Sequence, residues 1–319
     1  MADEMSSRRR LGVSRAALLG LVFLVAGACA EGDRVGPSEG TETALGGEIT
    51  TAAAALSGIV FSSSQLPVSQ LNSTHTGLVF TSTPSNILTT LSQIRSKGGR
   101  VLLKLTGENA YKTDGKFDLA KWKAGMDRYR NINIDSYIAD GTIVGHFILD
   151  EPHFPSRWGN QEIPQATVEA VAKYSKQRWP NLPTIVAAPA NWLASVSVSY
   201  VALDAGWATF RSKTSSDPAA WIAQQVKRAK SKGLGLVAGL NLLDGGNGSS
   251  GIQGTQPKTW AMSAAEVKTY GNALLGQSYV CAFSMWRYDA TYYNRTDIKN
   301  ALTDLSAKAR SHVKTACKQ

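Results

Sequence analysis

The sequence predicts a single (β/α)8 barrel, and three features of the chain after residue 55 support this prediction. Eight short apolar runs recur over about 260 residues. The runs are nearly continuous in apolar residues, which is typical of parallel strands that are covered on both faces. Amphipathic segments of helical length separate most of these runs, as expected of a barrel whose strands are joined by helices.

The predicted strands are the eight apolar runs in chain order. They span residues 58–63, 77–83, 100–107, 142–152, 184–192, 200–210, 234–246 and 280–289. A doubly wound sheet is the alternative fold. That fold needs a glycine-rich phosphate turn after its first strand, and the residues "FSSSQLP" found there do not form one.

Six of the intervening segments have the end signals of helices. They span residues 85–99, 118–138, 165–179, 217–233, 263–276 and 295–313. Asp217 followed by proline opens one of them, and Ser263 with Glu266 forms a capping box at the start of another. Two links are too short for the pattern: residues 64–76 have room for barely two turns, and residues 193–199 contain no predicted helix.

The first 29 residues have the pattern of an export signal. Three arginines precede an apolar run of 13 residues, "AALLGLVFLVAGA", which is too short to span a bilayer comfortably. The run ends at Cys29, so this region resembles a bacterial lipobox, in which the cysteine is lipidated. Ala26 stands where that motif more often has leucine. Free secretion with cleavage near "ACA" is the alternative.

The three predicted parts of the chain are a signal (1–29), a flexible tether (30–55) and the barrel (56–319). The tether is rich in Gly, Ala, Thr, Ser and Glu and lacks periodic apolar residues. We expect an exported monomer whose only membrane contact is the lipid anchor. The formal charge is +10, but the basic residues are scattered, so we expect no nucleic-acid partner.

Cys281 and Cys317 are the only cysteines after the signal. Cys281 opens the last predicted strand, and the final helix returns the chain to the same end of the barrel before Cys317. In an exported protein this placement favours a disulfide that fixes the C-terminal segment. Two unpaired thiols are the alternative.

Candidate site residues follow from the rule that such barrels place their active sites at the carboxyl ends of the strands. The candidates at these ends, in chain order, are Lys104, Glu108, Asp150, Glu151, Asn191, Trp192, Trp207, Arg211, Asn241, Asp244, Trp286 and Asp289. Acids, amides, an arginine and tryptophans suit carbohydrate, because indole rings stack on sugar faces and carboxylates and amides bind hydroxyls. Trp158 and Trp260 are expected on the same rim.

The residues "LDEP" at the end of the fourth predicted strand resemble the "NEP" that ends strand four in a large clan of retaining glycoside hydrolases. The resemblance implies that Glu151 is the general acid/base and that Asp150 takes the place of the amide that orients substrate. Trp286 matches a tryptophan that is common at the end of strand eight in those families.

The chain departs from that clan at two positions. It has Asp150 where the clan has asparagine, and "GLNLLDGG" at the end of the seventh strand lacks the clan's nucleophilic glutamate. Asp244 is the nearest carboxylate there, and Asp289 and Glu108 are further candidates for the second acid. Their separation from Glu151 would decide between retention and inversion.

The adjacent acids Asp150 and Glu151 have a definite expected division of roles. Like-charge repulsion is expected to raise the pKa of one of them, as a general acid requires. Because neighbouring side chains on a strand point to opposite faces, we expect Glu151 alone to face the site and Asp150 to be structural.

Two functions fit these features. The first is a glycoside hydrolase-like enzyme that cleaves O-glycosidic bonds of a poly- or oligosaccharide with two carboxylates. The alternative is a non-catalytic carbohydrate-binding surface lipoprotein on a degenerate barrel. Four histidines show no spacing of metal ligands, so we expect neither a metal nor another cofactor.

Overall fold

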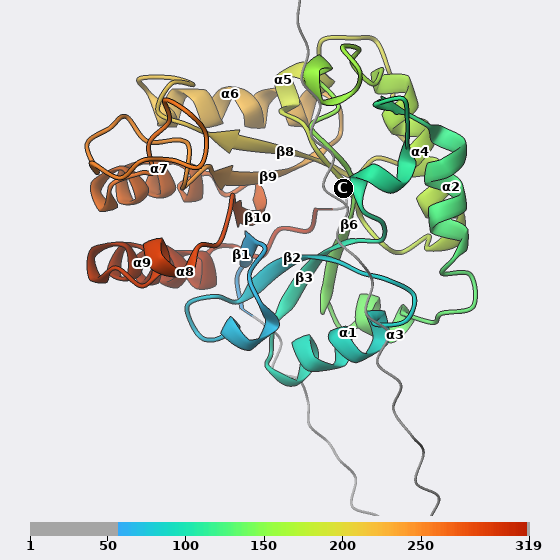
Figure 1. Ribbon diagram of the computed structural model, residues 1–319, viewed down its shortest axis with the longest axis horizontal. Helices are drawn as coiled ribbons and strands as arrows, with labels where there is room; N and C mark the ends of the chain where they lie inside the picture. Colours follow the sequence, from blue (N-terminus) through green and yellow to red (C-terminus); the bar gives the residue numbers. More distant parts are fainter. Residues whose placement is uncertain (1–56, 318–319) are drawn as a thin grey trace, which may run out of the picture. The chain divides into compact units, whose positions relative to one another are not determined.

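The computed structural model describes residues 57–317 and shows a closed barrel of eight parallel strands. Around the barrel the strand order is β1-β10-β9-β8-β7-β6-β3-β2. Figure 1 shows these strands in the centre with the helices around them. The strands are β1 (Val60–Ser64), β2 (Gly77–Thr81), β3 (Arg100–Lys104), β6 (Ile143–Asp150), β7 (Thr184–Ala187), β8 (Ala205–Phe210), β9 (Gly235–Leu240) and β10 (Val280–Met285). The predicted (β/α)8 fold is therefore confirmed.

Five of the six predicted helices are present, with ends within three residues of their predicted limits. The helices are α1 (Ile87–Ser96), α2 (Leu119–Asp127), α3 (Asp135–Ala139), α4 (Gln165–Arg178), α5 (Ala190–Leu193), α6 (Pro218–Ser231), α7 (Ala264–Leu275), α8 (Ala290–Tyr293) and α9 (Thr296–Ser311), with 3-10 turns η1 (Val68–Gln70), η2 (Glu108–Tyr111) and η3 (Pro155–Arg157). Asp217 caps α6 by accepting a hydrogen bond from the Ala220 amide, and the predicted capping box of Ser263 and Glu266 opens α7.

The signal, the tether and Cys29 all lie outside the described residues. Within residues 57–317 no helix has the length and apolar character needed to cross a bilayer.

Several elements differ from the prediction. The predicted helix 118–138 is two helices, α2 and α3, and the fifth strand ends at Ala187 instead of continuing to residue 192. Pro189 precedes the short α5, in a link where no helix was predicted. A small hairpin of β4 (Lys112–Thr113) and β5 (Lys116–Phe117) lies in the link between β3 and α2 and was also not predicted.

The sixth strand begins five residues later than predicted because a buried carboxylate holds the preceding segment as a loop. Glu169 on α4 is only 4% exposed and accepts hydrogen bonds from the backbone amides of Val201 (3.1 Å), Ala202 (3.0 Å) and Leu203 (3.0 Å). These amides are therefore unavailable to a neighbouring strand. β8 starts only at Ala205, once the amides are free for the sheet.

The apolar strands are buried on both faces. Val60, Leu102 and Ile185 belong to a cluster inside the barrel, whereas alternating residues such as Phe61 and Leu103 pack outward in the layer beneath the helices. This double burial is the physical reason for the continuous apolar runs in the sequence.

The amino-terminal end of the barrel is fastened by a disulfide between Cys281 on β10 and Cys317, as expected. Both cysteines are 4% exposed and belong to the cluster inside the barrel. A side chain at Gly235 would collide with the Cys317 carbonyl, so glycine is needed where the C-terminal segment crosses the start of β9. The segment that ends at Cys317 therefore closes part of this end of the barrel.

Removing the disulfide should lower the stability of the barrel. Because Cys281 and Cys317 are 36 residues apart, the Cys281→Ala/Cys317→Ala protein should lose about 3–4 kcal/mol of unfolding free energy, chiefly through a less restricted unfolded chain. Urea unfolding of both proteins, with and without a thiol reductant, measures this loss. The reductant should destabilise the parent and leave the double variant unchanged; equal sensitivity of the two would contradict the assignment.

Candidate active site

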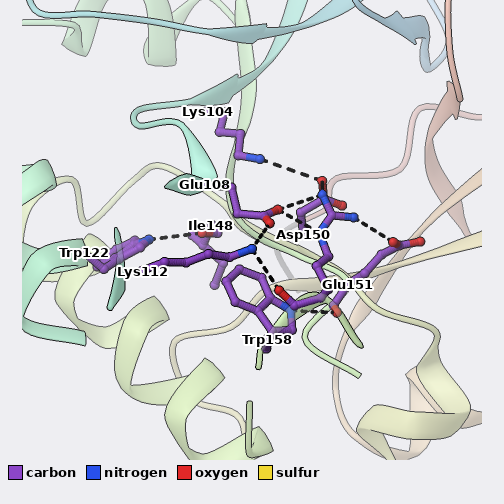
Figure 2. Close-up of polar contacts among 9 residues, drawn as sticks. Lys104, Glu108, Lys112, Trp122, Ile148, Asp150, Glu151 and Trp158 are labelled. Carbon is purple, nitrogen blue, oxygen red and sulfur yellow. Dashed lines mark hydrogen bonds and ion pairs between the residues drawn. The ribbon is translucent and has the colours of Figure 1, made fainter. Parts of the chain in front are cut away.

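The carboxyl ends of β3 and β6 bring three acids to one side of the barrel mouth. Asp150 ends β6 and Glu151 follows it, while Glu108 lies on η2, four residues after Lys104 ends β3. Figure 2 shows the side chains of Glu108, Asp150 and Glu151 converging on a common region. Their side chains are 16%, 21% and 32% exposed, so Glu151 is the most accessible of the three.

Arg157, at the end of η3, binds all three carboxylates. Its Nη1 donates to Glu151 Oε2 at 2.7 Å, and its Nη2 donates to Asp150 Oδ2 at 2.7 Å. Its Nε donates to Glu108 Oε2 at 2.7 Å, and Nη2 is 2.7 Å from the same oxygen. One planar guanidinium therefore holds three acids that would otherwise repel one another.

Two lysines complete the ionic network. Lys112 pairs with Glu108 through a very short contact, and its Nζ also donates to the Arg157 carbonyl at 2.8 Å. Lys104 Nζ lies 3.8 Å from Asp150 Oδ2 and 5.0 Å from the centre of the Phe147 ring. Lys112 thus binds Glu108 closely, and Lys104 forms a longer ion pair with Asp150.

The backbone at Glu151 explains why two adjacent acids reach the same guanidinium. Glu151 has φ of +50°, a left-handed conformation that costs a non-glycine residue energy. It is held by its amide, which donates to the Ala187 carbonyl at 3.0 Å, and by its carbonyl, which accepts from Trp158 Nε1 at 3.0 Å. The expectation that Asp150 and Glu151 point to opposite faces was therefore wrong, because the strand conformation ends between them.

The environments of Glu151 and Glu108 move their pKa values in opposite directions. Burial, followed by the charge of Asp150, raises the pKa of Glu151 above its ordinary 4.5, although Arg157 and Arg211 oppose this shift. Burial would also raise the pKa of Glu108, but its hydrogen bonds from Arg157 and Lys112 outweigh burial and lower the pKa. Two carboxyl groups whose pKa values are moved in opposite directions are typical of acid/base sites.

Burial and neighbouring charges also shift the pKa values of the basic groups Lys104 and Arg157. Burial lowers the pKa of Lys104, with the charges of Asp150 and Glu108 opposing that shift. For Arg157 burial would lower the pKa, but the three carboxylates outweigh it and raise the pKa. Arg157 is therefore charged at every working pH, whereas Lys104 is held less firmly in its charged form.

A packed aromatic wall positions Arg157. Trp158 is 1% exposed, stacks on Tyr111 with ring centres 6.1 Å apart, and meets Phe117 edge-on at 6.0 Å. Lys112 Nζ lies 4.5 Å from the centre of the Trp158 ring. Trp158 was expected on the rim as a sugar-stacking residue, but its ring is buried and joins the loop after β6 to the β4–β5 hairpin.

Sequence reasoning missed Arg157 and Lys112. Arg157 is the only lysine or arginine between Asp150 and Gln165, immediately after the "DEP" residues, and this isolated positive charge was an available signal. Lys112 lies on a hairpin that the apolar pattern does not reveal.

The other aromatic candidates occupy three different settings. Trp286 follows β10 and is 38% exposed, with Arg287 Cζ 5.7 Å from its ring centre. Trp192 is half-buried on α5, where its Nε1 donates to Glu162 Oε2 at 3.0 Å. Trp207 points into the barrel, packs against Phe147 with ring centres 5.2 Å apart, and is 8% exposed. Trp286 is thus the most accessible of the three rings.

Asp244 organises its own loop. Its Oδ1 accepts hydrogen bonds from the Thr255 amide (2.6 Å), the Gln256 amide (2.9 Å) and Thr259 Oγ1 (2.7 Å), and its Oδ2 accepts from Thr255 Oγ1 (2.6 Å). Burial would raise the pKa of Asp244, but these hydrogen bonds outweigh burial and lower it. The carboxylate is used to fold the segment 244–259. The glycine-rich residues 244–254 predict a flexible lid beside the site, whereas these bonds fix the start of that segment to residues 255–259.

The four remaining candidates lie in different local settings. Asp289 is exposed and caps α8 by accepting from the Tyr292 amide at 2.8 Å. Asn241 is 2% exposed, and its Oδ1 accepts from the Asp244 amide at 2.9 Å. Asn191 is exposed on α5, not at a strand end as expected. Arg211 follows β8 and is near enough for its charge to lower the pKa of Glu151.

The histidines and acids of the described residues do not form a metal site. Within residues 57–317 no cluster of three or more His, Cys, Asp or Glu side chains has a geometry that could hold a metal ion. His146 is 1% exposed, and its Nδ1 lies 2.7 Å from Ser175 Oγ. Burial lowers the pKa of His146 to about 3, as fits a neutral core residue.

Comparisons with known proteins identify the fold. No protein-family profile matches the chain, and no curated protein matches it. Saccharomyces cerevisiae Gas2p, solved with laminaritriose and laminaritetraose, matches 82% of this chain and 67% of its own at 12% identity, with a TM-score of 0.51. The glycoside hydrolase family 5 mannosidase from Rhizomucor miehei matches 74% of this chain and 84% of its own at 12% identity, with a TM-score of 0.45. At 12% identity, the likeness to these proteins is one of fold.

Replacing Arg157 by methionine should destabilise the protein at neutral pH. Because Arg157 is one-third exposed, the loss should be about 1–3 kcal/mol, less than for a fully buried ion pair. The pKa of Glu108 is depressed in the folded state, so the stability this gives is present above 4.5 and disappears as the pH falls through the lowered value. Urea unfolding at pH 7 and in stronger acid should therefore show a penalty that shrinks below pH 4.5.

The matched control is Arg295→Met. Arg295 forms an exposed pair with Asp297, with 3.3 Å between Nε and Oδ1, and its loss should cost at most about 1 kcal/mol. An Arg157→Met penalty no larger than that of the control at pH 7 would show that the network does not depend on Arg157.

Proposed function

We propose that the chain is a glycoside hydrolase-like enzyme that cleaves O-glycosidic bonds of a poly- or oligosaccharide, with Glu151 as the proton donor. One observation supports this most strongly: Glu151, with a raised pKa, and Glu108, with a lowered pKa, lie on one guanidinium at the mouth of a (β/α)8 barrel. Pairs of carboxyl groups whose pKa values are driven apart are what glycoside hydrolysis requires. The accessible Trp286 provides a ring on which a sugar face can stack.

In the proposed reaction Glu151 protonates the glycosidic oxygen as the bond to the anomeric carbon breaks. An ionised carboxylate then stabilises the positive sugar or activates the water that attacks it, and Glu108 is the group whose pKa fits this role. Oxygens that are each 2.7 Å from nitrogens of one guanidinium lie within roughly 8 Å of each other. This limit includes the separation of roughly 5 Å in retaining enzymes and the lower part of the range of roughly 6.5–9.5 Å in inverting enzymes. Arg157 and Lys112 keep Glu108 in the ionised form that this role requires.

The alternative function is saccharide binding without turnover. It is favoured by Asp244, the acid nearest the expected nucleophile position, whose oxygens are used by its own loop. Arg157 also favours this function, because it pairs with Glu108, Asp150 and Glu151 and neutralises their charge. Stacking rings and amides would still bind sugars in a barrel of this kind.

Export and anchoring belong to the same proposal. The apolar segment before Cys29 supports secretion with lipidation at that cysteine. The Cys281–Cys317 disulfide also supports it, because disulfides persist in oxidising compartments outside the cytosol. We propose a monomer that binds carbohydrate and no nucleic acid.

Replacing Glu151 by glutamine should lower turnover strongly without unfolding the protein. The change removes the transferable proton and keeps the shape of the side chain, so kcat should fall by about 10²–10⁴-fold. The mature protein and the variant are screened against polysaccharides and aryl glycosides, and circular dichroism checks folding. Saccharide binding that is the same in both proteins, with no turnover in either, would support the non-catalytic alternative.

The identity of the second carboxylate can be tested with three amide variants. Glu108→Gln should lower kcat by at least about 10²-fold, because it removes the ionised partner. Asp244→Asn and Asp289→Asn should each change kcat less than about tenfold, since these acids fold a loop and cap a helix. Greater loss from Asp244→Asn than from Glu108→Gln would reverse the assignment.

A further inference from the structure

A charged cavity lies at the end of the barrel opposite the candidate active site. It has a volume of about 480 Å³ and is lined by the strand starts at Arg100 and Val144, by Gly58, and by the C-terminal segment from Lys314 to Cys317. The disulfide therefore forms part of its wall. A cavity of this size is large enough for a small ligand.

Arg100 is the main cation in this cavity. It begins β3, two residues before the inward-facing Leu102, so strand alternation directs its side chain to the inside of the barrel. Only 7% of Arg100 is exposed. Its Nη1 donates to the Gly58 carbonyl at 3.3 Å, and its buried Nε has no partner among the described residues.

No carboxylate of residues 57–317 forms an ion pair with Arg100, although buried charges are normally paired. Burial alone lowers its pKa to about 10, so the guanidinium is still charged at neutral pH. An anion in the cavity would offset the cost of burying this charge.

The remaining charges around the cavity leave it positive. Lys314 lines it and forms no ion pair among the described residues. Among the described residues Asp140 is the only acid of its lining, and Arg95 holds that carboxylate at 2.6 Å. Two cations therefore face the cavity without a free acid among the described residues.

We propose that this cavity binds a small multivalent oxyanion, with the Arg100 guanidinium as its principal contact and Lys314 as a second. A guanidinium fork matches two oxygens of a carboxylate or a phosphate group. Because the C-terminal segment forms one wall, a bound oxyanion links that segment to β3 and β6 and stabilises the folded chain. This site is independent of the carboxylates at the other mouth.

Thermal unfolding of the full chain in phosphate, citrate or chloride at equal ionic strength tests this site. Millimolar phosphate or citrate should raise Tm by about 3 °C relative to chloride, as expected for a ligand present at about ten times its Kd. The larger response of the two shows whether inorganic phosphate or an organic carboxylate fits better. Isothermal titration calorimetry with the better anion then gives its Kd.

Variants separate binding at Arg100 from general salt effects. Arg100→Met should abolish the anion-dependent rise, and Arg100→Lys, which keeps the charge but not the fork, should weaken binding about tenfold. Arg228→Met removes an exposed arginine on α6 and should keep the full response. An unchanged Tm of the parent protein, or an equal rise in the parent and Arg100→Met or Arg100→Lys proteins, would overturn the proposal.

Discussion

The contact of one guanidinium with three carboxylates is the constraint on which the candidate site depends. Glu108, Asp150 and Glu151 would repel one another at the barrel mouth, and each is partly removed from water. Arg157 resolves this conflict because its nitrogens lie in a fixed plane and point to several oxygens at once. A lysine at the same position would present a single charged atom and could not fix the relative orientation of three acids.

The position of Arg157 depends in turn on packing. The loop after β6 is held by Trp158, whose indole donates to the Glu151 carbonyl and whose ring is covered by Tyr111 and Phe117. The β4–β5 hairpin thus acts on the site through an aromatic contact, without placing a carboxylate in it. Packing of apolar rings, not the polar network alone, sets where the guanidinium lies.

The sequence was sufficient to predict the barrel because its apolar runs have a physical cause and recur along the chain. Strands covered on both faces must be apolar throughout, and this pattern located all eight. It could not locate the start of β8, where the distant Glu169 takes the amides of residues 201–203. The apolar pattern also could not reveal Arg157 as the centre of the site, because a single arginine in a loop is not part of a periodic pattern. Glu151 was predicted as a site residue from its place at the end of the fourth apolar run, because such barrels carry their sites at the carboxyl ends of the strands.

Unequal sharing of Arg157 explains why two glutamates on the same cation differ in acidity. Glu108 is contacted by Nε and Nη2 and also by Lys112, whereas Glu151 is contacted by Nη1 alone. At Glu151, burial and the charge of Asp150 outweigh the attraction to Arg157 and raise the pKa. At Glu108, the contacts with Arg157 and Lys112 outweigh burial and lower the pKa. Moving Arg157 away from Glu151 would remove an opposing charge and favour its protonated form further. The protonation state of the site is therefore coupled to the position of one side chain, and that side chain is carried by a loop.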